Sequence, residues 1–364
     1  MNEPGKEQIE AAIAEYREPY LDMDLVSAKA IKSIDVESGM IRIAVELGFP
    51  ADGYKERLER ALTERLATLP GAKGAQAEVR WSVVAHAVQP TLKPLGSVRN
   101  IIAVASGKGG VGKSTTAANL ALALKADGAR VGLLDADIYG PSQPRMLGVR
   151  SERPQTVDGK SMRPVQALGL SCMSIGFLID EDQPMVWRGP MVTQALNQLL
   201  TETDWGELDY LLIDMPPGTG DIQLTLSQNV PVSGALIITT PQDIALLDAV
   251  KGLKMFEKVN VRVLGVVENM STHICSACGH EEPIFGEGGG ARMAKDHDVP
   301  LLGAIPLDLS VREEADGGRP TVVSQPDGEI AQRYMDIARR MSARLSLFAR
   351  DYSRLFPKIS IEDN

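Results

Sequence analysis

The sequence predicts an α/β fold in which helices flank a mostly parallel sheet, preceded by a small α+β domain. Apolar runs at residues 100–106, 131–134 and 208–213 suit strands that are buried on both faces, as parallel strands are. The first 86 residues instead alternate apolar and polar positions, which indicates half-buried strands. The 364 residues, 44% of them hydrophobic, can build two domains with a sizeable core. We expect an α+β domain at residues 1–86, a linker at 87–99 and an α/β domain at 100–357.

The N-terminal domain is predicted from its periodicity. Residues 40–47 alternate as a strand with one buried face, and residues 77–84 do the same. Between them, apolar residues recur every fourth position over residues 54–66, which predicts an amphipathic helix. Prolines and a glycine within residues 87–99 indicate a linker.

Residues 107–114 read Gly-Lys-Gly-Gly-Val-Gly-Lys-Ser, a pattern typical of a phosphate-binding loop. Glycines adopt backbone angles that side chains forbid, so successive amides can turn toward phosphate oxygens. Lys113 would add positive charge near the β- and γ-phosphates, and the Ser114 hydroxyl would ligate Mg²⁺. A helix predicted over residues 115–125 would point its N-terminus at the phosphates. The expected nucleotide-binding residues are Gly107, Lys108, Gly109, Gly110, Val111, Gly112, Lys113, Ser114 and Thr115.

Two acidic segments end the neighbouring predicted strands. One reads Asp135-Ala-Asp137, and the other begins at Asp214. The carboxyl ends of parallel strands open onto the crevice that holds the ligand, so these carboxylates should converge on the phosphates. Asp214 would hold a Mg²⁺-bound water, and Asp137 would orient or deprotonate the attacking water. Residues 216–218, Pro-Pro-Gly, could sense the γ-phosphate.

Further motifs follow in a fixed order. They are the loop with Lys108, Asp135-Ala-Asp-Ile-Tyr-Gly-Pro-Ser-Gln-Pro144, Ile213-Asp-Met-Pro-Pro-Gly-Thr-Gly-Asp221, Glu268-Asn-Met-Ser271 and Leu302-Gly-Ala-Ile-Pro-Leu-Asp308. Residues 98–345 thereby resemble the Mrp/ApbC group of deviant-Walker-A P-loop ATPases, which serve as iron-sulfur cluster carriers. The resemblance implies a P-loop NTPase fold, ATP hydrolysis, and a homodimer in which Lys108 reaches the partner's nucleotide. It also implies that Asn269 and the stretch around Pro306 contact adenine. The expected catalytic residues are Lys108, Lys113, Asp137 and Asp214.

Three cysteines are present. Cys172 lies in an apolar run, where a buried thiol that packs as a small hydrophobe is the expectation. Cys275 and Cys278 form a C-x-x-C in a polar segment, which fits a redox dithiol, half a zinc site or half a cluster site. An iron-sulfur cluster usually takes four thiolates, and a two-fold axis would supply the second pair. The family resemblance implies one [4Fe-4S] cluster bridged by Cys275 and Cys278 of both protomers.

Zinc is the alternative metal, because His273 and His280 flank the cysteine pair. The protein would then be a zinc-stapled regulatory ATPase. A disulfide oxidoreductase is disfavoured, since its C-x-x-C belongs at a helix N-terminus in a smaller α/β domain.

The N-terminal domain resembles the iron-sulfur-assembly module known as domain of unknown function 59, which precedes many Mrp-type ATPases. Many such modules carry a cysteine near the turn that is occupied here by residues 49–52, Phe-Pro-Ala-Asp. This domain has no cysteine, which argues against cluster ligation by its own side chains.

Charge and hydropathy restrict the partners. A formal net charge of −10 argues against nucleic acid, and no apolar stretch approaches a membrane span. The few cysteines and the absence of an apolar signal region favour the cytoplasm. Apolar residues at helical spacing from Ile330 to Leu355 alternate with arginines, and we expect this helix to pack on the core. If this helix bound membranes instead, it would indicate a MinD/ParA-like spatial-positioning ATPase. For a helix that packs on the core, we expect no stable membrane association.

The sequence therefore predicts an ATP-hydrolysing iron-sulfur cluster carrier. Its expected cofactors are ATP, Mg²⁺ and a [4Fe-4S] cluster. Its expected partners are a second copy of the chain, cluster scaffold proteins and the apo iron-sulfur proteins that receive the cluster.

Overall fold

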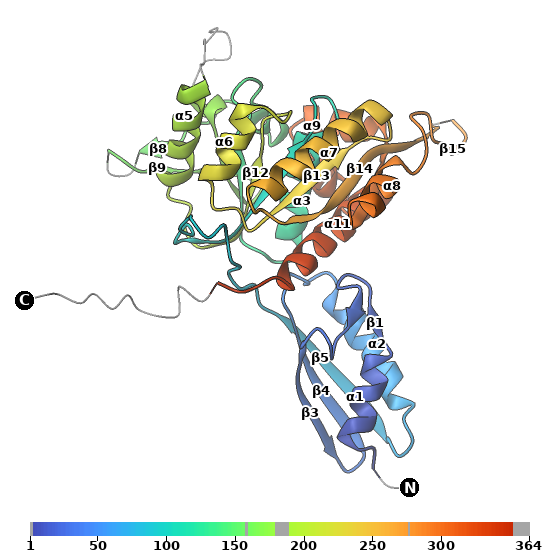
Figure 1. Cartoon of the computed structure of the whole chain (residues 1–364). Helices are drawn as coiled ribbons and strands as arrows, with labels where there is room; N and C mark the ends of the chain where they lie inside the picture. The colour runs from blue at the N-terminus through green and yellow to red at the C-terminus, as the bar shows by residue number, and fades with distance from the viewer. Residues whose placement is uncertain (1–2, 157–158, 179–188, 276, 352–364) are drawn as a thin grey trace, which may run out of the picture.

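The computed structural model describes residues 3–156, 159–178, 189–275 and 277–351. Figure 1 shows a small α+β unit at the N-terminus and a larger α/β unit, connected by a short extended segment. The predicted α/β fold with a mostly parallel sheet and a preceding α+β unit is confirmed. No helix within these ranges is both long and apolar enough to span a membrane.

The N-terminal unit is a three-stranded sheet in the order β3-β4-β5 with two helices against it. Strand β4 (Met40–Leu47) has the predicted bounds, and it buries alternate residues from Ile41 to Leu47. Helix α2 (Lys55–Ala67) lies where the every-fourth-residue pattern predicts it. Strand β5 (Gly74–Trp81) is shifted three residues toward the N-terminus from its prediction. The other elements, which the sequence analysis did not predict, are α1 (Lys6–Ala14), β1 (Arg17–Glu18), β2 (Met23–Asp24) and β3 (Ile31–Glu37).

The segment expected to be a linker is partly built into the larger unit. Gln89 is buried, and its Nε2 donates to the backbone oxygens of Ser227 (2.9 Å) and Val230 (3.1 Å). Its Oε1 accepts from the amide of Val232 at 3.0 Å. Strand β6 begins at Val98, so the last two residues of the predicted linker belong to the sheet. This segment is therefore anchored over part of its length.

The larger unit is built on a nine-stranded sheet, counted over the described residues. Its order is β10-β11-β7-β12-β6-β13-β14, and both β15 and β16 pair with β14. All pairings are parallel except those of β10 with β11 and of β15 with β14. The strands are β6 (Val98–Ser106), β7 (Val131–Asp135), β10 (Val165–Ala167), β11 (Leu170–Ser174), β12 (Leu208–Asp214), β13 (Gly234–Thr239), β14 (Val263–Ile274), β15 (Glu281–Glu282) and β16 (Leu301–Leu307). A separate hairpin pairs β8 (Gln155–Thr156) with β9 (Met162–Arg163).

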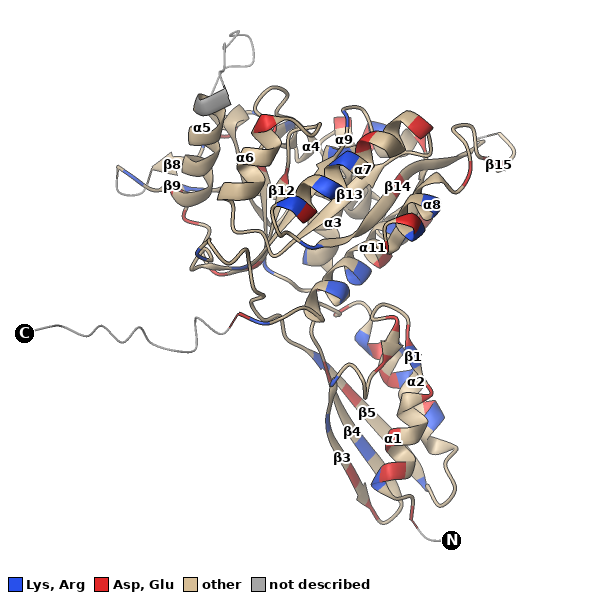
Figure 2. Ribbon diagram, in the orientation of Figure 1, with Lys and Arg blue, Asp and Glu red and all other residues tan. Residues whose placement is uncertain are grey.

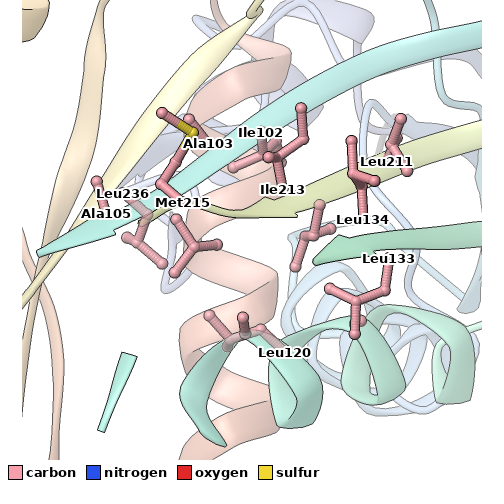
Figure 3. Packing of buried hydrophobic residues seen from close by; sticks show 14 of the residues in the cluster. Ile102, Ala103, Ala105, Leu120, Leu133, Leu134, Leu211, Ile213, Met215 and Leu236 are labelled. Carbon is pink, nitrogen blue, oxygen red and sulfur yellow. The ribbon is translucent and has the colours of Figure 1, made fainter. Parts of the chain in front are cut away.

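Helices cover both faces of this sheet, and Figure 1 shows α6 and α7 in front of it and α3 behind it. Because both faces are covered, β12 and β13 are buried at every position. Figure 3 shows side chains of β6, β7 and β12 packing toward Leu120 of α3. The helices are α3 (Lys113–Ala126), α4 (Gln143–Met146), α5 (Gly189–Thr201), α6 (Asp221–Asn229), α7 (Asp243–Lys258), α8 (Gly289–Asp296), α9 (Leu309–Asp316), α10 (Thr321–Ser324) and α11 (Glu329–Ser346).

The surface carries charges of both signs. Figure 2 shows Lys and Arg interspersed with Asp and Glu along α2 and α7. On α2 the charged positions are the polar counterpart of the buried apolar positions Leu58, Leu62 and Leu66.

Helix α11 packs on the core, as expected for the C-terminal apolar stripe. Tyr334, Ile337, Met341 and Leu345 are buried. The helix is shorter than the predicted stripe, because its last residue is Ser346 and Phe348 lies beyond its C-cap. The stripe positions Tyr352 and Leu355 lie outside the described residues.

A buried ion pair joins the two units. Arg339 of α11 donates from Nε and Nη2 to the Asp127 carboxylate at 2.7 and 2.9 Å. Asp127 caps the C-terminus of α3, and its Oδ1 also accepts from the amide of Gly53 in the N-terminal unit at 3.0 Å. The Arg339 guanidinium lies 5.6 Å from the ring centre of Tyr20 in the same unit. Arg339 is one of the arginines between the apolar positions of the C-terminal stripe, yet it is buried.

Candidate nucleotide site and cysteine pair

The phosphate-binding loop connects β6 to α3 at the carboxyl end of the central strands. Gly107 packs against α7 so closely that a Cβ there would lie 2.1 Å from the carbonyl carbon of Asp248. Gly112 caps α3 in the left-handed conformation, with a φ of 78°. These two positions require glycine, because one has no space for a side chain and the other has a backbone that side chains disfavour. The loop thus leads into a helix N-terminus, which favours anions.

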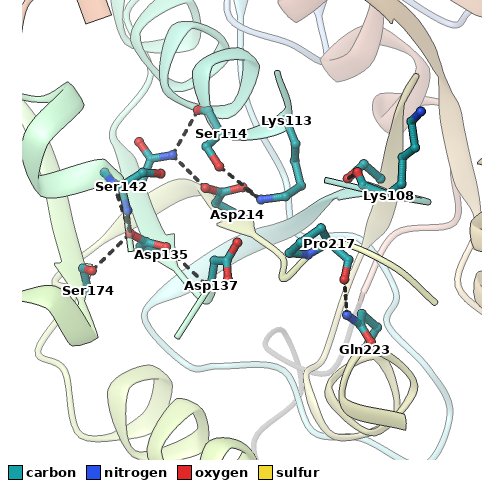
Figure 4. A network of polar contacts seen from close by, with 12 residues as sticks. Lys108, Lys113, Ser114, Asp135, Asp137, Ser142, Ser174, Asp214, Pro217 and Gln223 are labelled. Atoms are coloured by element: carbon teal, nitrogen blue, oxygen red, sulfur yellow. Dashed lines mark hydrogen bonds and ion pairs between the residues drawn. The ribbon is translucent and has the colours of Figure 1, made fainter. Parts of the chain in front are cut away.

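Lys113 and Asp214 form a buried ion pair at the centre of the site (Figure 4). The Lys113 Nζ contacts Oδ1 of Asp214 and lies 3.2 Å from the Ser114 hydroxyl. The other oxygen of Asp214, Oδ2, accepts from the side-chain amide of Gln143 at 2.8 Å. A serine hydroxyl and a carboxylate are oxygen ligands of the kind Mg²⁺ prefers, so Ser114 and Asp214 fit the predicted role.

Asp135 fixes the segment that carries Asp137. It is fully buried, and its carboxylate accepts from the amides of Asp137 (3.2 Å), Ser142 (2.9 Å) and Gln143 (3.1 Å). The Ser174 hydroxyl of β11 donates to the same group at 3.1 Å. Burial, together with the nearby negative charge of Asp214, raises the pKa of Asp135 to about 7.

Asp137 is half-buried and close to the same charges. Burial raises its pKa above the ordinary value, and this effect exceeds the opposing influence of Lys113. Figure 4 shows its carboxylate beside Asp214 and Lys113, so three of the predicted catalytic residues lie together.

Lys108 is separate from this group. Figure 4 shows its side chain pointing away from Lys113 and Asp214. Its backbone oxygen accepts from the Ser106 hydroxyl at 2.8 Å, which fixes the loop but not the ammonium group.

Asn269 and Pro306 lie beside the loop. The Asn269 side chain donates to the backbone oxygen of Val111 at 2.9 Å. Pro306 follows Ile305 in β16, and Ile305 is the residue paired with Asn269 of β14. Both residues are therefore at the same end of the sheet as the phosphate-binding loop.

No role was predicted for Gln143, and none for Asp135 beyond its place in the acidic motif. Gln143 lies six residues after Asp137, at the start of the short helix α4, and nothing in its local pattern indicates that it folds back onto β12. For Asp135 the signal was available, because it is the residue that ends a predicted buried strand.

The cysteine pair lies in a hairpin that extends β14. Beyond β14, the Cys275 amide donates to the His280 backbone oxygen (2.9 Å), and the Gly279 amide donates to the Cys275 oxygen (2.8 Å). Cys275 is half-buried and Cys278 is exposed, so a metal could reach both. The Ala277 amide, followed by the amide and thiol of Cys278, lowers the pKa of Cys275. Cys172, by contrast, is fully buried in β11 as predicted.

No group of three or more His, Cys, Asp or Glu side chains in the described part of one chain is arranged to hold a metal ion. His273 pairs with Glu282 in the β14–β15 ladder.

Comparison with known proteins assigns the family. Residues 97–342 match a family model described as NUBPL iron-transfer P-loop NTPase. The chain belongs to this family of iron-transfer P-loop NTPases. Residues 6–79 match a second model, described as iron-sulfur cluster assembly protein, which covers the N-terminal unit.

Relatives of this iron-transfer P-loop NTPase are named as iron-sulfur cluster carrier or transfer proteins. The iron-sulfur cluster carrier protein of Haemophilus influenzae is 50% identical over 345 residues, which span 93% of this chain and 91% of the relative. The iron-sulfur cluster transfer protein NUBPL of Mus musculus is 52% identical over 279 residues, 76% of this chain and 87% of the relative. A nucleotide-binding protein from Archaeoglobus fulgidus, solved with ADP, superposes with a TM-score of 0.57. That structure is 38% identical and covers 64% of this chain and 90% of its own.

These matches favour the carrier family over the spatial-positioning ATPases that the sequence analysis held as an alternative. The P-loop NTPase fold and the resemblance to iron-sulfur cluster carriers are both confirmed.

Proposed function

We propose that this iron-transfer P-loop NTPase hydrolyses ATP and uses it to control a [4Fe-4S] cluster that two copies of the chain bridge and pass to apo-proteins. One observation supports the coupling most directly. Strand β14 carries Asn269, which contacts the phosphate-binding loop, and continues into Cys275. The two positions are six residues apart, and the backbone between them is irregular, because Met270 has a φ of 54° and the pairing with β16 shifts between Asn269 and His273. A change at the loop therefore has a short covalent route to the thiols.

Hydrolysis requires Lys113 to leave Asp214. In the ion pair the lysine charge is neutralised, and an incoming triphosphate would attract it away from the carboxylate. Ser114 and Asp214 would then hold Mg²⁺, which neutralises phosphate charge in such reactions. Asp137, whose pKa is raised, is the group best placed to orient the attacking water and to accept its proton.

A homodimer would supply the four thiolate ligands that an iron-sulfur cluster usually takes. One chain offers the two accessible thiols Cys275 and Cys278, and an isologous contact would bring together four. Lys108 points away from its own Asp214, as expected for a residue that acts on the partner's nucleotide.

Ile244 and Leu247 are exposed on α7, next to the Asp248 that touches the loop. Their apolar side chains suit a surface that a second copy covers.

The cluster is tested by its composition. The wild type and the double variant Cys275→Ala/Cys278→Ala are reconstituted anaerobically, and iron, acid-labile sulfide, zinc and solution mass are measured. About four irons and four sulfides per dimer, lost in the variant, are expected for a bridging cluster. Cys172→Ala is the matched control, because it removes a buried thiol and leaves the hairpin intact. Stoichiometric zinc without sulfide would refute the cluster and favour the zinc-stapled alternative.

The role of ATP is tested separately with Lys113→Ala. Phosphate release should be lost, and cluster transfer to an apo iron-sulfur protein is then followed with and without ATP. Transfer that is ATP-dependent in the wild type and ATP-independent in the variant supports the coupling. Transfer that ignores ATP in both proteins contradicts it.

A further inference from the structure

Gln143 has no part in the function proposed above, yet its side chain lies at the centre of the site. It is the first residue of α4 and is fully buried. Its Nε2 donates both to Oδ2 of Asp214 at 2.8 Å and to the backbone oxygen of Ser114 at 3.0 Å. One side chain therefore connects the segment after Asp137, the end of β12 and the first turn of α3.

The hydrogen-bond partners of the Gln143 side-chain amide fix its orientation. Both of its Nε2 contacts are acceptors, a carboxylate and a carbonyl, so the opposite orientation would place an oxygen against two oxygens. Its Oε1 is buried with no partner among the described residues. The side chain is thus held by its two donated hydrogen bonds and not by its acceptor.

These contacts matter most when Lys113 moves. Within the described residues, the Asp214 carboxylate has two side-chain donors, Lys113 on Oδ1 and Gln143 on Oδ2. When Lys113 turns to the phosphates, Gln143 is the donor that remains. A buried carboxylate oxygen without a hydrogen-bond donor is costly, so this donor holds the Asp214 side chain in one orientation.

We propose that Gln143 is a positioning residue for Asp214, which keeps this carboxylate aimed at the Mg²⁺ position while Lys113 binds the phosphates. The predicted effect on the rate rests on the proposed ATP hydrolysis, whereas the predicted effect on nucleotide binding does not. The same side chain connects the segment after Asp137 directly to the phosphate-binding helix.

Two variants of Gln143 separate the effect of its donated hydrogen bonds from the effect of the space that its side chain fills. Gln143→Met keeps the length of the side chain and removes both donated hydrogen bonds. Gln143→Glu keeps the shape but places an acceptor against Asp214. The backbone of the loop should survive both changes, because Asp135 holds the amides of Ser142 and Gln143 independently of the side chain. Gln166→Met is the matched control, since its amide donates to the Ser171 hydroxyl on the exposed β10–β11 edge.

The first readout is the kinetics of ATP hydrolysis. A hydrogen bond to a charged group is worth about 1.5–3 kcal/mol, so kcat of Gln143→Met should fall about 10- to 100-fold. KM should change much less, because the contacts of the loop with the phosphates remain. The control variant Gln166→Met should match the wild type.

The second readout compares the two variants at one pH. Gln143→Glu keeps the shape of the side chain but places an acceptor against the Asp214 carboxylate, so its kcat should fall at least as far as that of Gln143→Met. A role in which Gln143 only fills space would leave kcat of Gln143→Glu close to that of the wild type.

The third readout does not need turnover. Binding of a fluorescent ADP analogue is measured over a range of Mg²⁺ concentrations, and Gln143→Met should need more Mg²⁺ than the wild type for the same gain in affinity. At saturating Mg²⁺, the condition of the kinetic assay, the two proteins should bind nucleotide alike. Wild-type kcat and Mg²⁺ dependence retained in both variants would overturn the inference. A wild type that binds nucleotide but never hydrolyses it would instead overturn the proposed hydrolysis, and the Mg²⁺ dependence of binding would still decide the role of Gln143.

Discussion

Replacing Arg339 by methionine should destabilise the protein far more than any exposed charge would. The Arg339 and Asp127 side chains are 8% and 2% exposed, and two hydrogen bonds of 2.7 and 2.9 Å connect them. The variant would leave the Asp127 charge buried with the Gly53 amide as its remaining cross-unit donor. Removing one partner of a buried pair costs about 3–5 kcal/mol, so the free energy of unfolding should fall by that amount.

The assay is urea unfolding monitored by circular dichroism and tryptophan fluorescence. The pair joins the two units, so we also expect the two probes to separate into different transitions in the variant. Arg333→Met on the same helix is the matched control, because its partner Glu329 is 71% exposed. An exposed pair contributes about 1 kcal/mol or less. A loss in Arg339→Met no larger than in Arg333→Met would refute the reasoning.

Two further predictions concern the nucleotide site. The raised pKa of Asp135, about 7 against an ordinary 3.8, means that the folded protein binds more protons than the unfolded chain between these values. Its contribution to stability is therefore complete below pH 3.8 and is lost as the pH rises through about 7. Urea unfolding should show this loss between about pH 4 and about pH 7, with little change above pH 7, and Asp135→Asn should flatten it. An equal slope in both proteins would contradict the assignment. Gly107→Ala should lower the free energy of unfolding by about 1–3 kcal/mol, because the added methyl group would collide with the backbone of Asp248. Gly96→Ala is the control and should have no such effect, since the space around Gly96 is open. Equal losses in the two variants would contradict the steric argument.

The elements that the sequence predicted well have local signals. Strand β4 and the phosphate-binding loop can be recognised from alternation and from glycine spacing within a few residues. Helix α3 begins two residues before its predicted start, because the loop lysine and serine already belong to its first turn. Such features depend on neighbours in the chain, which the sequence displays directly.

What could not be predicted depends on contacts between distant residues. Gln143 reaches Asp214, 71 positions away, and Arg339 reaches Asp127 at a separation of 212. An arginine on the polar side of a helix is normally solvated, but this one lies against Asp127 and against the rings of Tyr20 and Tyr54, and it is buried. The convergence of Asp135, Asp137 and Asp214 was predictable because the topology of parallel strands gathers strand ends. The contact of Gln143 with this group was not, since no such rule covers the segments between strands.

The anchored segment between the two sheets decides where the chain can be divided. A fragment that begins at Val98, at the first residue of β6, would leave Ser227, Val230 and Val232 without the hydrogen bonds that Gln89 provides. The edge of the larger unit would then expose backbone groups that are covered in the whole chain. A fragment that starts after Trp81 keeps these contacts, so the boundary useful for making the α/β unit alone lies at the end of β5 and not at the start of β6.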